Sequence, residues 1–535
     1  MSKLAAPIWV ESTNQAQAAV RRAAALGAAM VELRLDRVAH EPAMAKAVVQ
    51  AAELPCIVTC RPSWEGGYFE GDDSERLALF EAIGTAERQP AYLDLELAAW
   101  QQRGELRDGV AALVSDPAEA NDTAPGLILS AHDFEGRPTD LLRRLEAMAS
   151  EPRCRVIKLA WQARSLRDNL EAFELLRQQV KPMICLCMGE FGLPTRVLAP
   201  KFGGLVSFAA LDGEAGSAAG QLTLGQMKRS YRWDTLNPAT AVYGVVGYPV
   251  GHSMSPPLHN AGFEAIGHDG VYLPMPIHAE YEQFKATVGS WLAEPGVNLG
   301  GLSVTIPHKE NLLRYVASEG GQIESLAEAI GAANTLARRP DGTLYACNTD
   351  YAAALDAACA AMGIERSDLA GRRIAVIGAG GAARAIVAGF AHQGAAVTVY
   401  NRSPEKARAL VDRFDGQTGP VRSAALDAMA GAEANVWINC TPLGMAPKTD
   451  ASPVADAPAQ QPAWGVGTVV FDTIYNPPRT KLLQQAEAAG ATTISGIEMF
   501  VRQGAAQFEL WTHQPAPLDT FREVMRRHLS ANGEA

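Results

Sequence analysis

Charged residues alternate with apolar residues in a series of short segments that have the composition of β-strands. Lys158 lies between Ile157 and Leu159, and His132 ends the segment before it. A lysine held among apolar neighbours has a depressed pKa, so that its amine can attack a ketone, and a histidine can move a proton beside it. Arginines bind anionic substrates in a bidentate manner. This set predicts imine-assisted proton abstraction next to a carbonyl, as in an aldolase or a dehydratase.

The same segments carry the other charges on one face each. Side chains alternate along a strand, so residues two apart lie on the same side. Such pairs are Glu32 with Arg34, Thr59 with Arg61, Asp94 with Glu96, and Ser130 with His132. Buried charges are costly unless they are paired, and a row of them on several strands is typical of the active-site rim of a barrel. We expect these side chains to point inward near the carboxyl ends of the strands.

The first part of the chain repeats a strand and a helix about every 29 residues, which predicts a (β/α)8 barrel. The alternative is an open, doubly wound sheet. The expected strands are 8–11, 30–35, 57–61, 92–95, 127–132, 156–160, 183–187 and 205–208. Expected helices include 16–26, 75–87 and 166–179.

A boundary is expected in the segment 231–238, where a helical pattern at 222–231 ends before a new strand at 241–246. Its Asn237-Pro238 pair favours a turn and a helix end. The predicted organisation is a barrel at 1–232, a linker at 233–240, a two-layer substrate domain at 241–349 and a Rossmann-type domain at 350–497. Helices at 498–535 are expected to return to the substrate domain. The fold class is therefore α/β.

A glycine-rich turn in the second half indicates dinucleotide binding. A strand at 372–377 runs into Gly378-x-Gly380-x-x-Ala383 and then a helix at 384–393. Such a turn lets a pyrophosphate approach the helix N-terminus. After the strand 396–400, where an NAD enzyme would show Asp or Glu, the chain has Asn401-Arg402. An arginine there favours NADP over NAD.

The segment before this turn offers hydroxyl groups, a lysine and a carboxylate. Ser253 and Ser255 have same-side spacing, and Lys309 follows a strand that ends at Pro307. Asn334-Thr335 and Asn348-Thr349-Asp350 add groups that can bind hydroxyls and orient an ammonium. His252, His259 and His308 have no partners at metal-ligand spacing, so we expect structural or loop roles and no metal.

Composition narrows the class of protein. The chain has 535 residues, 47 Lys and Arg against 59 Asp and Glu, and a net charge of −12. This balance argues against nucleic acid or an anionic membrane as a partner. No apolar run is long enough to span a bilayer, and the eight cysteines are expected to be buried thiols. A strand-like segment follows the first residues directly, so the expected location is cytoplasmic.

Six motifs in the first half resemble type I 3-dehydroquinate dehydratase over about residues 7–232. They are Glu32-x-Arg34-x-Asp36, Arg61-x-x-x-Glu65-Gly66-Gly67, Ser130-x-His132, Lys158, Met188-Gly189 through Arg196, and Ser217-x-x-Gly220-Gln221. The resemblance implies that Lys158 forms a Schiff base and that His132, with Glu65, is the general acid and base. It implies substrate binding by Glu32, Arg34, Arg61, Arg196, Ser217 and Gln221. Ala219 stands where the family usually has proline.

The second half resembles shikimate dehydrogenase over about residues 240–530. The motifs include Ser253-x-Ser255-Pro256, Thr305-Ile306-Pro307-x-Lys309, Asn348-Thr349-Asp350, Asp472-x-x-Tyr475 and Gly496-x-x-Met499-x-x-x-Gln503. The resemblance implies Lys309 and Asp350 as the catalytic pair. It implies substrate binding by Ser253, Ser255, Thr305, Asn334, Tyr475 and Gln503. Expected cofactor contacts are Gly378, Gly380, Gly381, Ala382, Ala383, Asn401, Arg402, Ser403, Lys406, Thr441 and Met499. Ser303 replaces a common asparagine, which could favour quinate as a second substrate, and Ala353 replaces a usual glycine.

Together the resemblances imply a bifunctional enzyme of the shikimate pathway. It would dehydrate 3-dehydroquinate to 3-dehydroshikimate and then reduce this product to shikimate with NADPH. One alternative is a dehydratase joined to a catabolic quinate/shikimate dehydrogenase that uses NAD. Another is a metabolite-sensing regulator without turnover, which the presence of Lys158, His132, Lys309 and Asp350 disfavours.

Overall fold

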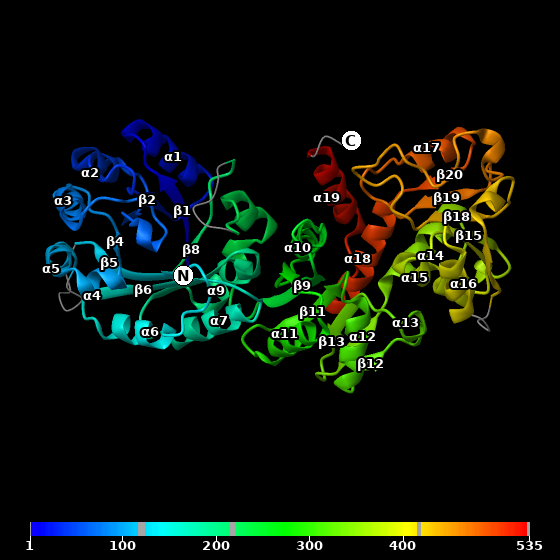
Figure 1. The fold of residues 1–535 in the computed structure, drawn as a ribbon, viewed down its shortest axis with the longest axis horizontal. Coiled ribbons are helices and arrows are strands. Elements are labelled where there is room, and N and C mark those ends of the chain that lie inside the picture. Colours follow the sequence, from blue (N-terminus) through cyan, green and yellow to red (C-terminus); the bar gives the residue numbers. More distant parts are fainter. Residues whose placement is uncertain (1, 116–123, 214–219, 415–418, 532–535) are drawn as a thin grey trace. The chain divides into compact units, whose positions relative to one another are not determined.

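The first sheet is an eight-stranded parallel barrel surrounded by helices (Figure 1). The computed structural model describes residues 2–115, 124–213, 220–414 and 419–531. The strands follow the order β7-β6-β5-β4-β3-β2-β1-β8, and the Leu205 amide donates to the Met183 carbonyl to join β8 to β7. The strands are β1 (Lys3–Trp9), β2 (Met30–Arg34), β3 (Cys56–Thr59), β4 (Tyr92–Glu96), β5 (Gly126–Asp133), β6 (Cys154–Gln162), β7 (Met183–Met188) and β8 (Val206–Phe208). The predicted barrel is confirmed.

Helices alternate with these strands because their apolar residues recur at helical spacing and cover the outside of the sheet. They are α1 (Thr13–Ala25), α2 (Pro42–Ala51), α3 (Asp73–Gly84), α4 (Leu97–Gln102), α5 (Gly104–Leu113), α6 (Leu141–Ser150), α7 (Asp168–Gln178), α8 (Leu193–Val197) and α9 (Ala199–Phe202). In the segment 222–231, where a helix was expected, residues 224–230 are helical, and Gln226–Ser230 form a π-helical turn.

The inward face of the barrel changes from apolar to charged along the strands. At the amino ends it carries Met30, Ile57, Ile128, Val156 and Ile184, which pack together in one buried cluster. Two residues further along the same face are Glu32, Thr59, Ser130 and Lys158, which are also buried. Because side chains alternate along each strand, the inward face carries apolar residues near the amino ends of the strands and polar residues near the carboxyl ends.

The second sheet is mixed and has the order β10-β9-β11-β13-β14-β12. Its strands are β9 (Ala241–Gly247), β10 (Gly270–Pro276), β11 (Leu299–Val304), β12 (Gln322–Ile323), β13 (Thr335–Arg338) and β14 (Leu344–Cys347). Its helices are α10 (Ser255–Ile266), α11 (Tyr281–Ala293), α12 (Lys309–Ser318) and α13 (Ser325–Ile330). Sheet and helices form the layers that carry the second predicted site.

The third sheet is wholly parallel and has the order β17-β16-β15-β18-β19-β20, the doubly wound arrangement of a dinucleotide fold. Its strands are β15 (Arg373–Ile377), β16 (Ala396–Tyr400), β17 (Val421–Ala424), β18 (Val436–Asn439), β19 (Val469–Asp472) and β20 (Thr492–Ile494). Its helices are α14 (Thr349–Met362), α15 (Gly381–His392), α16 (Pro404–Arg413) and α17 (Lys481–Ala488). The predicted strand, glycine turn and helix are all present.

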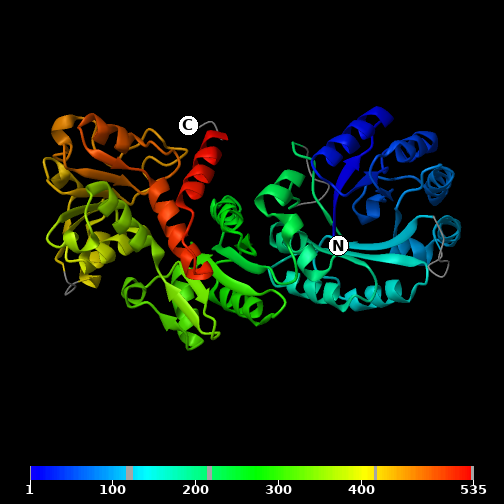
Figure 2. The same ribbon diagram turned by 180° about the vertical axis from the view of Figure 1, so that it is seen from behind.

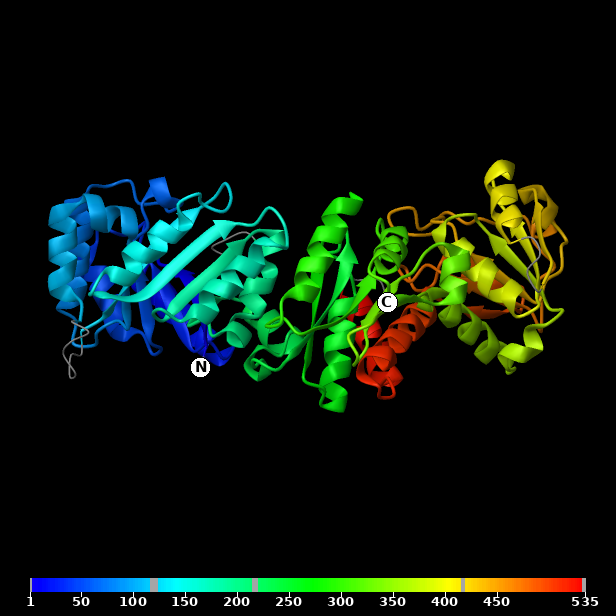
Figure 3. The same cartoon turned by 90° about the horizontal axis from the view of Figure 1, so that it is seen from below.

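Two helices follow the third sheet and lie beside the elements of the second (Figures 2 and 3). Helix α18 (Gly496–Thr512) packs on α14 and also contacts β11 and β13, while α19 (Leu518–Ala531) packs on α10. Residues far along the chain thus reach the side chains of the second sheet.

The chain forms two compact units, one of residues 1–241, 275–277 and 286–298, and one of the remainder. The finer domain boundaries stay predictions. All eight cysteines are free thiols, buried except for the half-buried Cys440, as expected. In the described part of the chain, no helix is both long and apolar enough to cross a membrane.

Candidate active sites

Lys158 lies inside the barrel on β6 and is 6% exposed. Its Nζ donates to Asp94 Oδ2 at 2.8 Å and to Glu32 Oε1 at 3.2 Å. The expectation that apolar groups surround the amine is wrong, because the adjacent Ile157 and Leu159 point to the other face of the strand. The amine lies instead in an ion-pair network, with the Phe208 ring 5.0 Å away.

Carboxylates and arginines from neighbouring strands continue this network. Arg61 donates through Nη2 to Asp94 at 2.7 Å and through Nη1 to Glu96 at 2.8 Å and to Ser130 at 2.7 Å. Arg76, which reaches in from α3, donates to the other Glu96 oxygen at 2.7 Å. Although burial opposes its charge, Asp94 and Glu96 raise the pKa of Arg61. Both Nη atoms of Arg61 are therefore engaged by protein groups, although its side chain lines the cavity as predicted.

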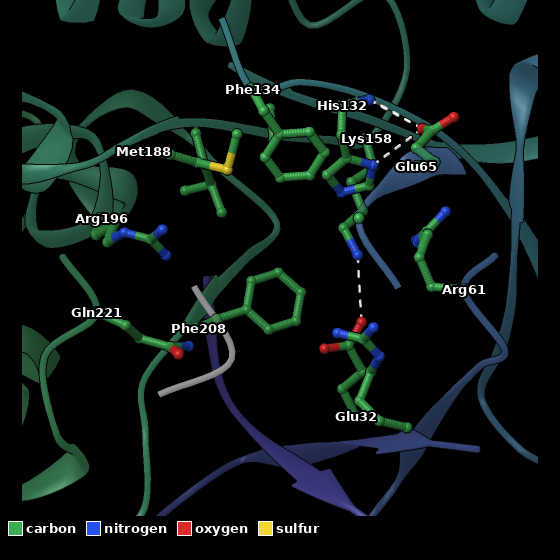
Figure 4. Close-up of a pocket in the computed structure, with 14 residues that line it drawn as sticks. Glu32, Arg61, Glu65, His132, Phe134, Lys158, Met188, Arg196, Phe208 and Gln221 are labelled. Atoms are coloured by element: carbon green, nitrogen blue, oxygen red, sulfur yellow. Dashed lines mark hydrogen bonds and ion pairs between the residues drawn. The ribbon is translucent and has the colours of Figure 1, made fainter. Parts of the chain in front are cut away.

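Glu65 and His132 form a hydrogen-bonded pair at the edge of this cavity (Figure 4). Glu65 Oε1 accepts from the His132 amide at 2.9 Å and lies 3.0 Å from its Nδ1. Burial raises the pKa of Glu65 to about 7, and burial with the charges of Arg61 and Lys158 holds the pKa of His132 well below its usual range. A neutral imidazole that donates from Nδ1 keeps a lone pair on Nε2, as a general base requires.

Two glycines allow the turn that carries Glu65. The turn Ser63–Glu65 ends at Gly66, whose φ of 77° is left-handed. A Cβ on Gly66 would lie 2.2 Å from Phe134, and one on Gly67 would lie 1.9 Å from the Arg61 carbonyl oxygen. Glycine is therefore required at both positions for the loop to bring Glu65 to His132.

Arg196 and Gln221 lie across the cavity from Lys158 and His132, with Met188 and Phe208 between (Figure 4). Arg196 is 2% exposed and, among the described residues, makes no ion pair, while its Nε has no hydrogen-bond partner. Burial lowers the pKa of its guanidinium to about 10. A buried cation without an acidic partner is suited to an anionic ligand. Ser217 and Ala219 lie outside the described residues.

The remaining residues predicted for the barrel site are Glu32 and Arg34, and both line the same cavity. The sequence prediction left out Asp94, Glu96 and Ser130 as site residues, although it placed them on the inward face. The alternation of polar and apolar side chains along β4 and β5 was the signal that could have identified them as site residues. The hydrophobic wall formed by Phe134, Met188 and Phe208 was also missed.

The second cavity is built around Lys309 and Asp350. Lys309 begins α12, directly after β11, and its Nζ donates to Asp350 Oδ2 at 2.5 Å. Asn334 donates to the other Asp350 oxygen at 2.9 Å. The Asn348 side chain caps α14 by accepting from the Asp350 amide at 3.0 Å. Both oxygens of the carboxylate are therefore fixed, and the ammonium is held beside it.

All six residues predicted to bind substrate in the second half line this cavity. They are Ser253, Ser255, Thr305, Asn334, Tyr475 and Gln503. Ser303 and Gln507 line it too, and Tyr272 donates to Ser303 at 2.6 Å, which donates to Gln507 at 2.6 Å. Gln507 was missed, although it lies one helical turn after Gln503 on α18.

Except for Met499, which is on α18, the predicted cofactor residues follow the carboxyl ends of β15, β16 and β18, which are neighbours in the third sheet. Gly378 has a φ of 112°, and a Cβ there would lie 3.1 Å from the Thr441 side chain. A Cβ on Gly380 or Gly381 would meet nothing within 4 Å, so the N-terminus of α15 is open to a ligand. Ala382 and Met499 line the substrate cavity, and Thr441 lines an adjoining cavity. Ala383 is buried in α15, whereas Asn401, Arg402, Ser403 and Lys406 follow β16, with Arg402 and Lys406 exposed.

A buried carboxylate connects the loops that line these two cavities. Asp472, at the end of β19, accepts from Asn439 at 3.0 Å and from Thr480 at 2.6 Å. Asn439 in turn accepts from the Thr441 amide at 2.9 Å and the Thr441 hydroxyl at 2.7 Å. Burial raises the pKa of Asp472 to about 6. The network fixes Thr441 and the start of the loop that carries Tyr475.

Among the described residues, no group of His, Cys, Asp or Glu side chains could hold a metal ion, and this includes the three histidines expected to have structural or loop roles. His259 is fully buried against Tyr272, and burial lowers its pKa to about 3. His308 is buried and pairs with Asn311 at 2.9 Å. His252 lines both cavities of the second half.

The geometry defines a class of protein with two enzyme sites. One site is a barrel with a buried lysine beside a histidine and carboxylate pair, and the other is a lysine and aspartate pair beside a dinucleotide-type sheet. Residues 4–238 match the family described as type I 3-dehydroquinase. Residues 245–336 match the shikimate dehydrogenase substrate binding domain, 360–447 match shikimate/quinate 5-dehydrogenase, and 496–526 match the shikimate 5'-dehydrogenase C-terminal domain.

Individual relatives agree with these family matches. The bifunctional 3-dehydroquinate dehydratase/shikimate dehydrogenase, chloroplastic, of Arabidopsis thaliana is 33% identical over 98% of this chain and 85% of its own. The NADP(+) shikimate dehydrogenase of Methanothermobacter thermautotrophicus is 39% identical over 54% of this chain and 98% of its own. A shikimate 5-dehydrogenase structure from Thermus thermophilus is 30% identical, covers 54% of this chain and 99% of its own, and has a TM-score of 0.46. The chain belongs to the family of bifunctional 3-dehydroquinate dehydratase/shikimate dehydrogenases.

Proposed function

We propose that the chain catalyses two consecutive reactions, dehydration of 3-dehydroquinate to 3-dehydroshikimate and NADPH-dependent reduction of this product to shikimate. The observation that carries the proposal is the presence of both complete sites in one chain: Lys158 beside Glu65 and His132, and Lys309 beside Asp350. The Arabidopsis thaliana relative is described by the same two activities and the other two relatives by the second activity alone. None of these names favours a catabolic quinate dehydrogenase or a regulator.

In the barrel, the Lys158 ammonium first loses a proton to solvent. The free amine then attacks the substrate ketone and forms a Schiff base as water leaves. The imine withdraws electrons, so the proton on the adjacent carbon becomes acidic. His132 Nε2 removes this proton while Glu65 holds Nδ1, and the resulting imidazolium protonates the departing hydroxyl. Hydrolysis of the imine then releases 3-dehydroshikimate and the free amine. Arg196, with no acidic partner among the described residues, binds the substrate carboxylate.

In the second site, Ser253, Ser255 and Tyr475 hold the cyclic substrate beside Lys309 and Asp350. When bound, NADPH would supply the hydride that reduces the carbonyl carbon. The glycine turn and the open N-terminus of α15 fit the pyrophosphate, and Arg402 fits the 2′-phosphate. Lys309 donates a proton to the carbonyl oxygen, Asp350 orients the ammonium, and the lysine amine then takes up a proton from water.

Product analysis by NMR tests both steps in one experiment. From 3-dehydroquinate, we expect 3-dehydroshikimate alone without NADPH and shikimate with NADPH. Borohydride added during turnover should label the wild-type chain at Lys158 and leave Lys158→Ala unlabelled. Labelling of Lys158→Ala would refute the Schiff-base assignment, and turnover of quinate with NAD in preference to shikimate with NADP would favour the catabolic alternative.

The expected cytoplasmic location is also part of this proposal. Fractionation of source cells, followed by detection of the chain in the cytosolic fraction, is the test. Recovery in an organelle or an envelope fraction would refute it.

A further inference from the structure

Asp36 has no role in the dehydration chemistry described above, yet it accepts four hydrogen bonds from the residues around the barrel site. It lies two residues beyond β2 and is 3% exposed. Oδ1 accepts from Arg34 Nε at 3.2 Å and from the Arg61 amide at 3.1 Å. Oδ2 accepts from Arg34 Nη2 at 2.6 Å and from the Tyr68 amide at 3.1 Å. Each carboxylate oxygen thus has two donors, which fills its acceptor capacity.

Two of these donors are the backbone amides at the ends of the loop that carries Glu65. The loop closes on itself because the Phe69 amide donates to the Arg61 carbonyl at 3.1 Å and the Ser63 amide donates to the Phe69 carbonyl at 2.9 Å. Asp36 holds this closed loop to the end of β2, and the loop places Glu65 on His132. The position of Glu65 against His132 therefore depends on the Asp36 carboxylate, which contacts neither of these two residues.

The other two donors belong to one side chain in the cavity wall. Arg34 lines the cavity, and its guanidinium is held by two parallel bonds to Asp36 and by the Trp9 ring 4.3 Å away. A bidentate carboxylate pair fixes the plane of a guanidinium, and stacking on an aromatic ring fixes its side. Asp36 thus also determines where Arg34 presents its remaining N–H groups.

We propose that Asp36 is a positioning residue of the dehydratase, which fixes Arg34 and the Glu65 loop through one carboxylate. The proposal rests on the proposed dehydratase function. It assigns Asp36 two separable effects: the loop contacts act on kcat through Glu65, and the Arg34 contacts act on KM.

Asp36→Asn tests this role with almost no change of volume. The amide keeps one acceptor oxygen and replaces the other by a donor, which would face either Arg34 Nη2 and the Tyr68 amide or Arg34 Nε and the Arg61 amide. We expect kcat of the dehydratase to fall about 30- to 100-fold and KM to rise about 10-fold, because a misplacement of about 1 Å has effects of this size. The dehydrogenase activity of the same chain is the internal control and should not change.

Asp72→Asn is the matched control variant. Asp72 is an exposed cap of α3 that accepts from the Ser74 and Glu75 amides. Because asparagine caps helices as well as aspartate does, both activities should keep their wild-type values. Asp36→Asn should also retain borohydride labelling at Lys158, since imine formation needs neither Arg34 nor Glu65.

Double variants separate positioning from a general structural role. If Asp36 acts through Glu65, adding Asp36→Asn to Glu65→Gln leaves kcat at the value of Glu65→Gln alone. If it acts through Arg34, adding it to Arg34→Met leaves KM at the value of Arg34→Met alone. Effects that multiply in both cycles would overturn the proposal.

Three other results would also overturn it: wild-type kcat and KM in Asp36→Asn, loss of labelling at Lys158, or a parallel fall of both enzyme activities. The last result would mean that Asp36 stabilises the whole chain. A wild-type chain that is neither labelled by 3-dehydroquinate nor able to dehydrate it would instead refute the proposed function.

Discussion

Replacement of Arg196 by methionine should stabilise the free barrel and impair the dehydratase at the same time. Burial lowers the pKa of Arg196 to about 10, and no described residue is its acidic partner, so the charged form is disfavoured in the folded protein. One pKa unit corresponds to about 1.4 kcal/mol. The lowered pKa therefore means that the buried cation reduces the folding stability of the substrate-free enzyme by about 3 kcal/mol. Methionine fills much of the same space and carries no charge.

We therefore expect Arg196→Met to raise the free energy of unfolding of the barrel by about 1 to 3 kcal/mol, since part of the arginine stem's packing is lost. For a unit of this size each kcal/mol corresponds to a rise of about 2 to 4 °C in the unfolding temperature. The same change removes the charge-assisted bonds proposed between Arg196 and the substrate carboxylate, which would be worth at least about 3 kcal/mol together. The expected loss in dehydratase kcat/KM is therefore about 150-fold or more.

Calorimetry of the intact chain without substrate measures the first effect, and the ultraviolet absorbance of the conjugated product measures the second. Arg76→Met is the contrasting variant. Arg76 is equally buried but paired with Glu96 at 2.7 Å. The Arg76→Met change removes one of the two cations on Glu96, so it should destabilise the barrel. If Arg196→Met lowered the unfolding temperature as Arg76→Met does, a partner would have to neutralise Arg196 in the free protein, and the reasoning would be wrong.

For three further variants, the structure predicts the direction in which stability or kcat changes. Glu65 has a folded pKa of about 7 against an ordinary 4.5, so the wild type loses stability as the pH rises from 4.5 to 7. Glu65→Gln should therefore be more stable than the wild type above pH 7 and equally stable below pH 4.5. Urea unfolding at a series of pH values measures this difference. Gly66→Ala places a Cβ 2.2 Å from Phe134, and its dehydratase kcat should fall at least about tenfold with unchanged dehydrogenase rates; an unaffected dehydratase would refute the clash. Lys309→Met should lower dehydrogenase kcat by about 10²- to 10⁴-fold without affecting dehydration, as NADPH oxidation would show.

The fold could be predicted largely from the sequence because strands alternate with helices at a regular interval. The expected barrel strands all exist, with ends that shift by a few residues, and β1 begins at Lys3, earlier than the expected start at Ile8. Strand ends depend on which amides find partners in the neighbouring strand, and this information is not local. The helical pattern before the predicted linker holds over residues 224–230, but the sequence did not indicate that Gln226–Ser230 form a π-helical turn.

The residues of the candidate sites could be predicted from the sequence, but their hydrogen-bond and ion-pair partners could not. The sequence placed Lys158 on an inward face, but its partners Asp94 and Glu32 come from strands far away in the chain. Local composition therefore predicted apolar surroundings where the barrel supplies carboxylates. Gln507 needed a different argument, because only the helical spacing from Gln503 indicates that both residues face the same cavity.

The chain of charges from Arg76 through Glu96, Arg61 and Asp94 to Lys158 has a consequence for how such a sequence can diverge. Each member pairs with its neighbours, so the loss of any single one unbalances the buried charges of the others and destabilises the protein. Their substitutions are consequently epistatic. A descendant that abandoned dehydration would have to exchange several of these side chains in concert, because Asp94 and Glu32 are paired with the charge of Lys158 whether or not this lysine acts in catalysis.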